Sequence, residues 1–139
     1  MNLISQDVYD ETLSPPRLIA GRFVKDGRIV FPLPDGSSGE DVERIHLKRE
    51  GKLWAYTVQR FPPGPPFVGV RDAAEFKPFA IGYVELENEI IVESHIVVDD
   101  FSLLSVGMPM TLTTTIIPGG DDREDVRMFA FKPVGPEKT

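Results

Sequence analysis

The residues that could take part in metal or acid–base chemistry are few and scattered. The chain has two histidines, His46 and His95, and no cysteine. Structural zinc sites use four ligands, mostly cysteine and histidine at close spacing. A metal held between the two histidines is the alternative, but neither has a second ligand residue at such spacing. We therefore expect each histidine to be hydrogen-bonded or to face solvent.

Paired carboxylates form the second group. Asp99 and Asp100 could bind a cation or act as acid and base, but an aspartate before one helical turn is typically an N-cap, which we favour. The acidic run 121–125 lacks calcium-loop spacing and is expected at a hairpin tip. Ser94 and His95 are neighbours on an expected strand, so they point to opposite faces. The sequence thus offers no nucleophile with its base, and it indicates a protein that is not catalytic alone.

The elements that must position these residues are mostly strands. Apolar and polar residues alternate in short runs, which 12 glycines and 13 prolines separate. We expect strands at 22–24, 28–31, 42–48, 53–61, 80–86, 90–98, 110–117 and 126–132. Five strands after residue 50 suit a closed OB-type barrel, with a β-sandwich as the alternative. Residues 1–14 are expected to form a short helix or extended segment that ends at Ser14.

Charge and hydropathy exclude several classes of partner. The 139 residues carry 22 acidic and 15 basic side chains, a net charge of −7. Nucleic acids and anionic membranes both draw affinity from lysine and arginine, so neither is an expected partner. We expect no signal peptide and no apolar run of about 20 residues that could span a bilayer, which predicts a cytoplasmic protein.

The most unusual segment is a proline-rich loop between two expected strands. Prolines restrict this loop before binding, which lowers the entropy cost of docking. We therefore predict that it binds a partner protein, and a lid over the barrel end is the alternative. Nearby Trp54, beside Tyr56, is expected in the core or on the barrel surface rather than in a base-stacking platform. The predicted partner-binding residues are Phe61, Pro62, Pro63, Pro65, Pro66 and Phe67.

Five segments, in this order and spacing, resemble a known family. They are Leu18-Ile19-Ala20-Gly21-Arg22, Val30-Phe31-Pro32, Gly51-Lys52-Leu53-Trp54-Ala55-Tyr56-Thr57-Val58, Pro78-Phe79-Ala80-Ile81-Gly82-Tyr83-Val84-Glu85-Leu86 and Val106-Gly107-Met108-Pro109-Met110. The chain is similar, over roughly residues 17–134, to the acyl-CoA-associated proteins that join a rubredoxin-like zinc ribbon to an OB-fold. The resemblance implies an N-terminal segment at 1–16, ribbon-like hairpins at 17–48, an OB-fold at 49–134 and a tail at 135–139.

Members of this family are accessory subunits of thiolase-like or lipid-transfer-type acyl-CoA enzymes. The resemblance therefore implies a hetero-oligomer in which the partner performs the thiolase, aldolase or acyltransferase chemistry. It also implies acyl-CoA as a ligand, and Arg60, Arg71 and Lys77 are the residues that could meet its phosphates. An OB-fold nucleic-acid-binding protein is the alternative, and a free-standing enzyme is a third reading.

The sequence departs from the family at the metal. The two Cys-x-x-Cys knuckles of the family ribbon fall on Phe23 and Asp26 and on Asp35 and Ser38. Phenylalanine and serine are not structural zinc ligands. We therefore expect a degenerate ribbon without zinc, and no other cofactor.

Overall fold

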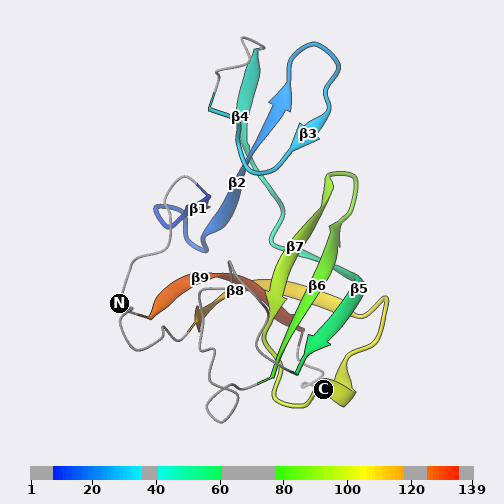
Figure 1. Cartoon of the computed structure of the whole chain (residues 1–139). Coiled ribbons are helices and arrows are strands. Elements are labelled where there is room, and N and C mark those ends of the chain that lie inside the picture. The colour runs from blue at the N-terminus through cyan, green and yellow to red at the C-terminus, as the bar shows by residue number, and fades with distance from the viewer. Residues whose placement is uncertain (1–7, 36–40, 61–77, 118–124, 135–139) are drawn as a thin grey trace.

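The computed structural model describes residues 8–35, 41–60, 78–117 and 125–134. A small N-terminal sheet stands on a closed barrel (Figure 1). The sheet contains β1 (Tyr9–Asp10), β2 (Arg17–Phe23), β3 (Ile29–Val30) and β4 (Val42–His46). The barrel contains β5 (Glu50–Gln59), β6 (Phe79–Leu86), β7 (Ile90–Ile96), β8 (Pro109–Ile117) and β9 (Val126–Pro133), with one 3-10 helix, η1 (Phe101–Leu103).

The barrel closes in the strand order β5-β6-β7-β9-β8. Only β7 and β9 pair in parallel; the other neighbours are antiparallel. Alternate residues point inward, as Val84 and Val92 do where they face each other across β6 and β7, and both are almost fully buried. Burying each such side chain contributes about 1.5–3 kcal/mol. The predicted mostly β fold with a five-stranded OB-type barrel is thus confirmed, and the sandwich alternative is wrong because the sheet closes on itself.

A bulge in β5 breaks the alternation of that strand. The register with β6 shifts between Leu53 and Ala55, so Trp54 has no partner of its own. Leu53 is buried in the barrel, whereas 55% of the Trp54 surface is exposed. At the start of β5, Gly51 lies so close to β6 that a Cβ atom there would collide with the Glu85 carbonyl oxygen. The single tryptophan of the chain therefore faces outward, next to inward-facing Leu53, and the bulge reverses the facing of the residues that follow it.

The N-terminal sheet is built around β2, which pairs with β3 on one edge and with β4 on the other. Gly21, in the middle of β2, makes this possible because a Cβ there would meet Val42, Leu33 and Pro34. The predicted hairpin turn at 25–27 is also observed, and Gly27 supplies the positive φ of 77° that it needs.

The expected N-terminal helix is not found in the described part of this segment. The carbonyl of Val8 accepts a hydrogen bond from the Ile19 amide, and β1 then pairs with β2. The Asp10 carboxylate accepts hydrogen bonds from the amide and hydroxyl of Thr12. Such a local turn competes with helix formation, and strand pairing buries Tyr9. Residues 1–7 lie outside the described residues.

No helix among the described residues is long and apolar enough to cross a membrane.

Candidate functional site

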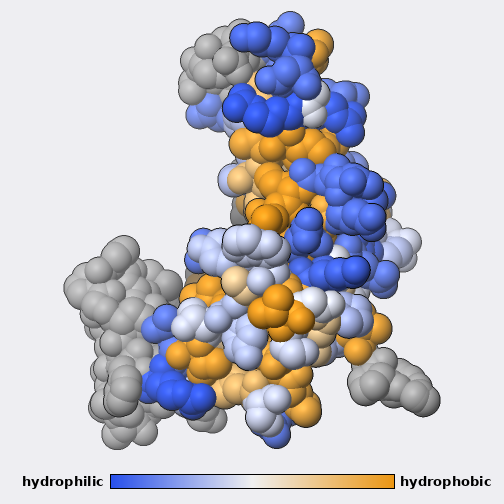
Figure 2. All heavy atoms as spheres, turned by 90° about the vertical axis from the view of Figure 1, so that its right-hand side faces the viewer, coloured by the Kyte–Doolittle hydropathy of each residue, from blue (hydrophilic) through white to orange (hydrophobic). Residues whose placement is uncertain are grey.

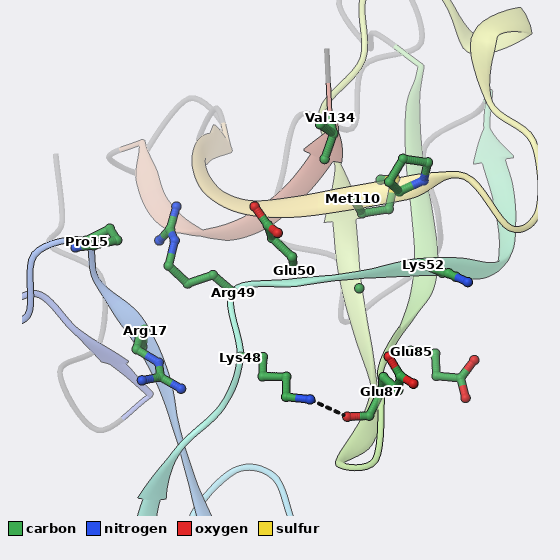
Figure 3. A pocket seen from close by; sticks show the side chains of 12 residues that line it. Pro15, Arg17, Lys48, Arg49, Glu50, Lys52, Glu85, Glu87, Met110 and Val134 are labelled. Carbon is green, nitrogen blue, oxygen red and sulfur yellow. Dashed lines mark hydrogen bonds between the residues drawn. The ribbon is translucent and has the colours of Figure 1, made fainter. Parts of the chain in front are cut away.

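An open groove of about 970 Å³ lies where the N-terminal sheet meets the barrel (Figure 3). Its walls come from the N-terminal segment, the link between β4 and β5, the start of β5, the end of β6 and the paired ends of β8 and β9. The lining residues are Pro15, Arg17, Lys48, Arg49, Glu50, Gly51, Lys52, Glu85, Glu87, Pro109, Met110 and Val134.

Two arginines of this groove bond to main-chain carbonyl groups. Arg49 donates to the carbonyl oxygens of Pro16, at 2.6 Å, and Leu112, at 3.1 Å. Arg17 donates through Nε to the Leu47 carbonyl at 2.8 Å. These bonds join the N-terminal segment to β8 and to the link that follows β4. The Arg49 guanidinium therefore holds the N-terminal segment against the barrel, whereas Arg17 ties β2 to the end of β4 and the link that follows it.

Lysines and glutamates complete the groove and nearly cancel in charge. Lys48 Nζ donates to the Glu87 carbonyl at 3.1 Å, as the dashed line in Figure 3 marks. Lys52 faces Glu85 across β5 and β6. The lining holds four cations and three glutamates, so its net formal charge is +1. That charge is too small to make the groove a strong anion site, and we assign its polar groups to structure.

An aspartate–histidine pair fastens the N-terminal segment to β4. His46 Nε2 lies 2.9 Å from Oδ2 of Asp10, and Arg44 lies 3.5 Å from the same oxygen. Hydrogen bonds from Thr12, and then from His46, hold the pKa of the Asp10 carboxyl well below its usual range. The sequence predicted a hydrogen-bonded or solvent-facing His46 but gave no sign of its partner, because 36 positions separate the two residues.

The second histidine lies against the outside of the barrel. The His95 ring stacks on Phe79 with ring centroids 5.0 Å apart. Burial lowers the pKa of His95, because the charged imidazolium would lose its solvation. Ser94 points the other way and donates its hydroxyl to the His95 carbonyl. The two side chains thus point to opposite faces of β7, as the sequence predicted.

Asp100 is a helix cap, as the sequence predicted. Its carboxylate accepts hydrogen bonds from the Ser102 amide, at 2.9 Å, and from the Ser102 hydroxyl, at 2.7 Å. It is the N-cap of η1, and these bonds lower its pKa. Asp99 lies beside it, exposed to solvent. The two carboxylates thus have different surroundings and do not form a paired acid–base site.

The positions of the family's first knuckle hold a different arrangement. The Arg28 guanidinium carbon lies 4.5 Å from the centroid of the Phe23 ring, and Asp26 Oδ1 accepts a hydrogen bond from the Arg28 amide. Phe23 offers no atom that could ligate a metal. Asp35 is exposed, and Ser38 lies outside the described residues. Nowhere in the described ranges do three potential ligand residues gather, and these side chains do not fit a thiolate zinc site.

Most of the predicted binding residues cannot be placed. The partner-binding residues Phe61, Pro62, Pro63, Pro65, Pro66 and Phe67 lie outside the described residues, as do Arg71 and Lys77. Arg60 is exposed at the end of β5, with its guanidinium carbon 5.6 Å from the centroid of the Phe101 ring.

Comparison with known proteins gives the chain a family. No curated protein matches it. Its fold is similar to a solved structure described as an Ltp2-ChsH2(DUF35) aldolase, with a TM-score of 0.56 and 21% identity over 84% of this chain and 84% of that one. A family model described as the C-terminal OB-fold domain of ChsH2 matches residues 45–115, just over half of the chain. That match spans the link after β4, the β5-β6-β7 sheet and most of β8, so the chain belongs to the ChsH2 C-terminal OB-fold family.

Proposed function

We propose that this chain is a non-catalytic accessory subunit of a thiolase-like or lipid-transfer-type acyl-CoA enzyme. The observation that carries the proposal is the family match over residues 45–115. The structural relative is described as an aldolase that contains both Ltp2 and ChsH2(DUF35), which agrees with a subunit that works beside a catalytic chain. In this proposal the partner performs the carbon–carbon chemistry, and this chain stabilises it and helps to hold the acyl-CoA thioester.

The ionisable residues support a role without catalysis. Asp100 caps η1, His95 stacks on Phe79, and His46 is bonded to Asp10. The Ser102 hydroxyl that bonds to Asp100 belongs to the cap of η1, where the same carboxylate also accepts the Ser102 amide. In the described part of the chain, neither histidine accepts a hydrogen bond from a serine or threonine hydroxyl, as a base that activates a nucleophile would. Thr12 donates its hydroxyl to Asp10, but the same carboxylate is already shared with His46.

The finer details rest on sequence. We propose the loop 61–67 as a partner contact through Phe61 and Phe67, and Arg60, Arg71 and Lys77 as residues that meet CoA phosphates. We also propose that the subunit binds no zinc, because Phe23 stands at a knuckle position and lies under Arg28.

Co-expression with the thiolase-like protein of the same organism tests the function. A tag on the thiolase-like protein alone should retain this chain through size-exclusion chromatography. Retro-aldol cleavage or thiolysis of acyl-CoA should need both chains or be much faster with both. A thiolase-like protein that is stable and fully active alone, and that does not retain this chain, would refute the proposal.

A role in nucleic-acid binding is not favoured. Single-stranded nucleic acid requires aromatic platforms in a positively charged channel. The exposed Tyr83 lies opposite Glu93 and two positions before Glu85, so carboxylates border it on both strands. With a net charge of −7, this arrangement repels a phosphate backbone.

A further inference from the structure

Exposed apolar side chains gather on one side of the barrel. Ten large hydrophobic residues are exposed in the described part of the chain, and six of them lie on β5, on the two strands that follow it in the sheet, or on the segment beside its other edge. Tyr56 pairs with Gly82, whose missing Cβ would point toward the core residues Leu53 and Ile96, so Tyr56 lies on the opposite face of the sheet from Tyr83. We name the other five the β5 wall. They are Trp54, Tyr83, Ile91, Leu103 and Val106.

The centre of the β5 wall is an aromatic pair. The rings of Trp54 and Tyr83 meet edge to face with centroids 6.4 Å apart. Trp54 faces outward because its neighbour Leu53 points into the core. Trp54 is 55% exposed and Tyr83 is 42% exposed. Edge-to-face packing stabilises this arrangement of the two rings, which lowers the entropy cost of docking on them.

The segment 101–108 extends the β5 wall along the strand. The Arg60 guanidinium lies over Phe101, the Tyr56 hydroxyl donates to the Leu104 carbonyl, and the Gly107 amide donates to the Leu53 carbonyl. Because of these contacts, the segment lies antiparallel to β5, along the edge of β5 that does not pair with β6. Leu103 and Val106, between the anchored residues, are 61% and 66% exposed.

Carboxylates border the aromatic pair. Glu93 lies directly opposite Tyr83 on β7, and Glu85 follows two positions later on β6. Among the described residues, neither carboxylate is in an ion pair. Figure 2 views the side on which β5 lies in Figure 1, and it shows hydrophobic and near-neutral residues mixed across the barrel below a hydrophilic band. Lys52 lies opposite Glu85 on β5, so Glu93 is the carboxylate of this border that faces no lysine or arginine across the β6-β7 pair. The surface thus combines an aromatic centre with the negative charge of Glu93 beside it.

We propose that the β5 wall docks on the catalytic partner, at a partner surface that presents an arginine within an apolar patch. This rests on the proposed function. A guanidinium group is attracted both by the faces of the Trp54 and Tyr83 rings and by the Glu93 carboxylate opposite Tyr83. Tryptophan, tyrosine and arginine are also the residues that dominate binding energy at interfaces. A second copy of this chain would place its own carboxylates against these carboxylates, and a nucleic acid would place phosphates there. Both arrangements bring like charges together and are repulsive. Charge complementarity therefore favours a partner that supplies a cation.

The single tryptophan allows a direct test on the full chain. Incorporation of 5-fluorotryptophan gives one ¹⁹F resonance, from Trp54. Titration with the unlabelled thiolase-like protein should shift or broaden that resonance and reduce its solvent-isotope effect. Trp54→Ala should weaken the complex by roughly 30-fold or more, as expected for an aromatic anchor. Glu93→Lys should also weaken it, because a positive charge then meets the partner's arginine.

Two control variants change exposed residues of similar kind that lie outside the β5 wall. Ile116→Ala on β8 removes a side chain that is 46% exposed, and Asp41→Lys reverses a charge beside β4. Both should leave affinity unchanged, and all four variants should melt as the wild type does. Full affinity in Trp54→Ala together with an unmoved ¹⁹F resonance would overturn this surface while the accessory role stands. Failure of the wild-type chain to bind the thiolase-like protein would sink the function itself.

The ¹⁹F experiment also distinguishes two other molecules that could bind to the β5 wall, a second copy of this chain and a nucleic acid. A ¹⁹F shift that depends on the concentration of this chain alone would assign the β5 wall to a second copy. A shift caused by a single-stranded oligonucleotide would assign it to nucleic acid. Either result, with no response to the thiolase-like protein, would overturn the proposal.

Discussion

The Arg28 guanidinium lies over the ring of Phe23, 4.5 Å from its centroid, at the turn between β2 and β3. The Gly27 amide closes the same turn on the Phe23 carbonyl, at 2.7 Å, and Asp26 accepts from the Arg28 amide. A cation over an aromatic face contributes about 0.5–1 kcal/mol at an exposed site. Side-chain and main-chain contacts thus close this turn, at the position where the sequence resemblance implied the first knuckle of a ribbon.

We predict that the chain folds without zinc. Protein purified without a histidine tag should contain well below one zinc per chain by elemental analysis. Its melting temperature should be the same with and without EDTA, since removal of a structural zinc normally unfolds the site it supports. A stoichiometric metal content, or a large loss of stability in the chelator, would contradict the prediction.

Arg28→Ala offers a separate measurement on the same turn. It should destabilise the chain by about 0.5–1 kcal/mol in urea unfolding, because the cation–π contact is lost. Lys25→Ala, in the same turn, changes a charge without an observed contact and should be nearly neutral. Equal effects of the two variants would show that the contact with Phe23 contributes nothing.

The pKa of His95 predicts a pH dependence of stability. Burial lowers this pKa in the folded chain below its usual value near 6.5. At lower pH the unfolded chain therefore takes up a proton that the folded chain does not, and the free energy of unfolding falls as the pH drops from about 6.5 through the native pKa. One proton accounts for at most about 1.4 kcal/mol per pH unit.

Thermal unfolding between pH 7.5 and 5 checks this effect. The His95→Gln variant should be less stable at neutral pH, because the ring no longer stacks on Phe79, but its stability should fall less steeply toward pH 5. An NMR titration of the His95 ring should give a midpoint below 6.5. A wild type and variant with parallel pH profiles would contradict the prediction.

The barrel was predictable from sequence because its pattern is local. Alternation of apolar and polar residues defines β6 and β7, and the turn at 87–89 has the positive φ at Asn88 that a tight connection needs. The N-terminal helix was a wrong prediction because spacing alone cannot reveal that Tyr9 pairs with Leu18. Local amphipathicity suggested a helix, and strand pairing outweighed it.

The candidate sites were less predictable because they join distant segments. The groove brings Arg17, Arg49 and Met110 together from three parts of the chain. The bulge at Trp54 reverses the inward and outward positions of the later residues of β5, so that Val58 packs on the core. A prediction from sequence assumes that inward and outward side chains alternate without a break along a strand. For β5 this assumption assigns the residues after the bulge to the wrong face.

The contacts of Arg49 predict a large loss of stability in Arg49→Ala. This side chain bonds to the Pro16 and Leu112 carbonyl oxygens and is only partly exposed. Hydrogen bonds to a charged group contribute about 1.5–3 kcal/mol each, so the variant should lose about 3 kcal/mol in urea unfolding. Hydrogen exchange near residues 8–16 should accelerate, because the segment loses its bond to the barrel.

Arg22→Ala is the matched control. Arg22 pairs with Glu43 at 3.5 Å, with both side chains about half exposed, and such surface pairs contribute about 0–1 kcal/mol. Arg49→Lys should fall between the two, since an ammonium group cannot reproduce the fork of a guanidinium. If Arg49→Ala were as stable as Arg22→Ala, the two hydrogen bonds of Arg49 would not be what holds the N-terminal segment to the barrel.

The loop 61–67 gives the last prediction, which rests on its sequence and on the proposed partner. Phe67→Ala should weaken binding to the thiolase-like subunit by about 30-fold, because a central aromatic anchor typically contributes about 2 kcal/mol. The four prolines restrict the free loop, so little entropy is lost when it docks. Isothermal titration calorimetry with purified chains measures the affinity.

The alternative is that Phe67 packs on its own barrel. In that case Phe67→Ala would lower the melting temperature of the isolated chain and leave partner affinity unchanged. Our prediction is the opposite pair of results, an unchanged melting temperature with weaker binding. Combining Phe67→Ala with Trp54→Ala then asks whether the loop and the β5 wall share one interface. Additive losses of binding free energy indicate independent contacts, whereas a smaller loss in the double variant indicates that the two aromatic side chains depend on each other.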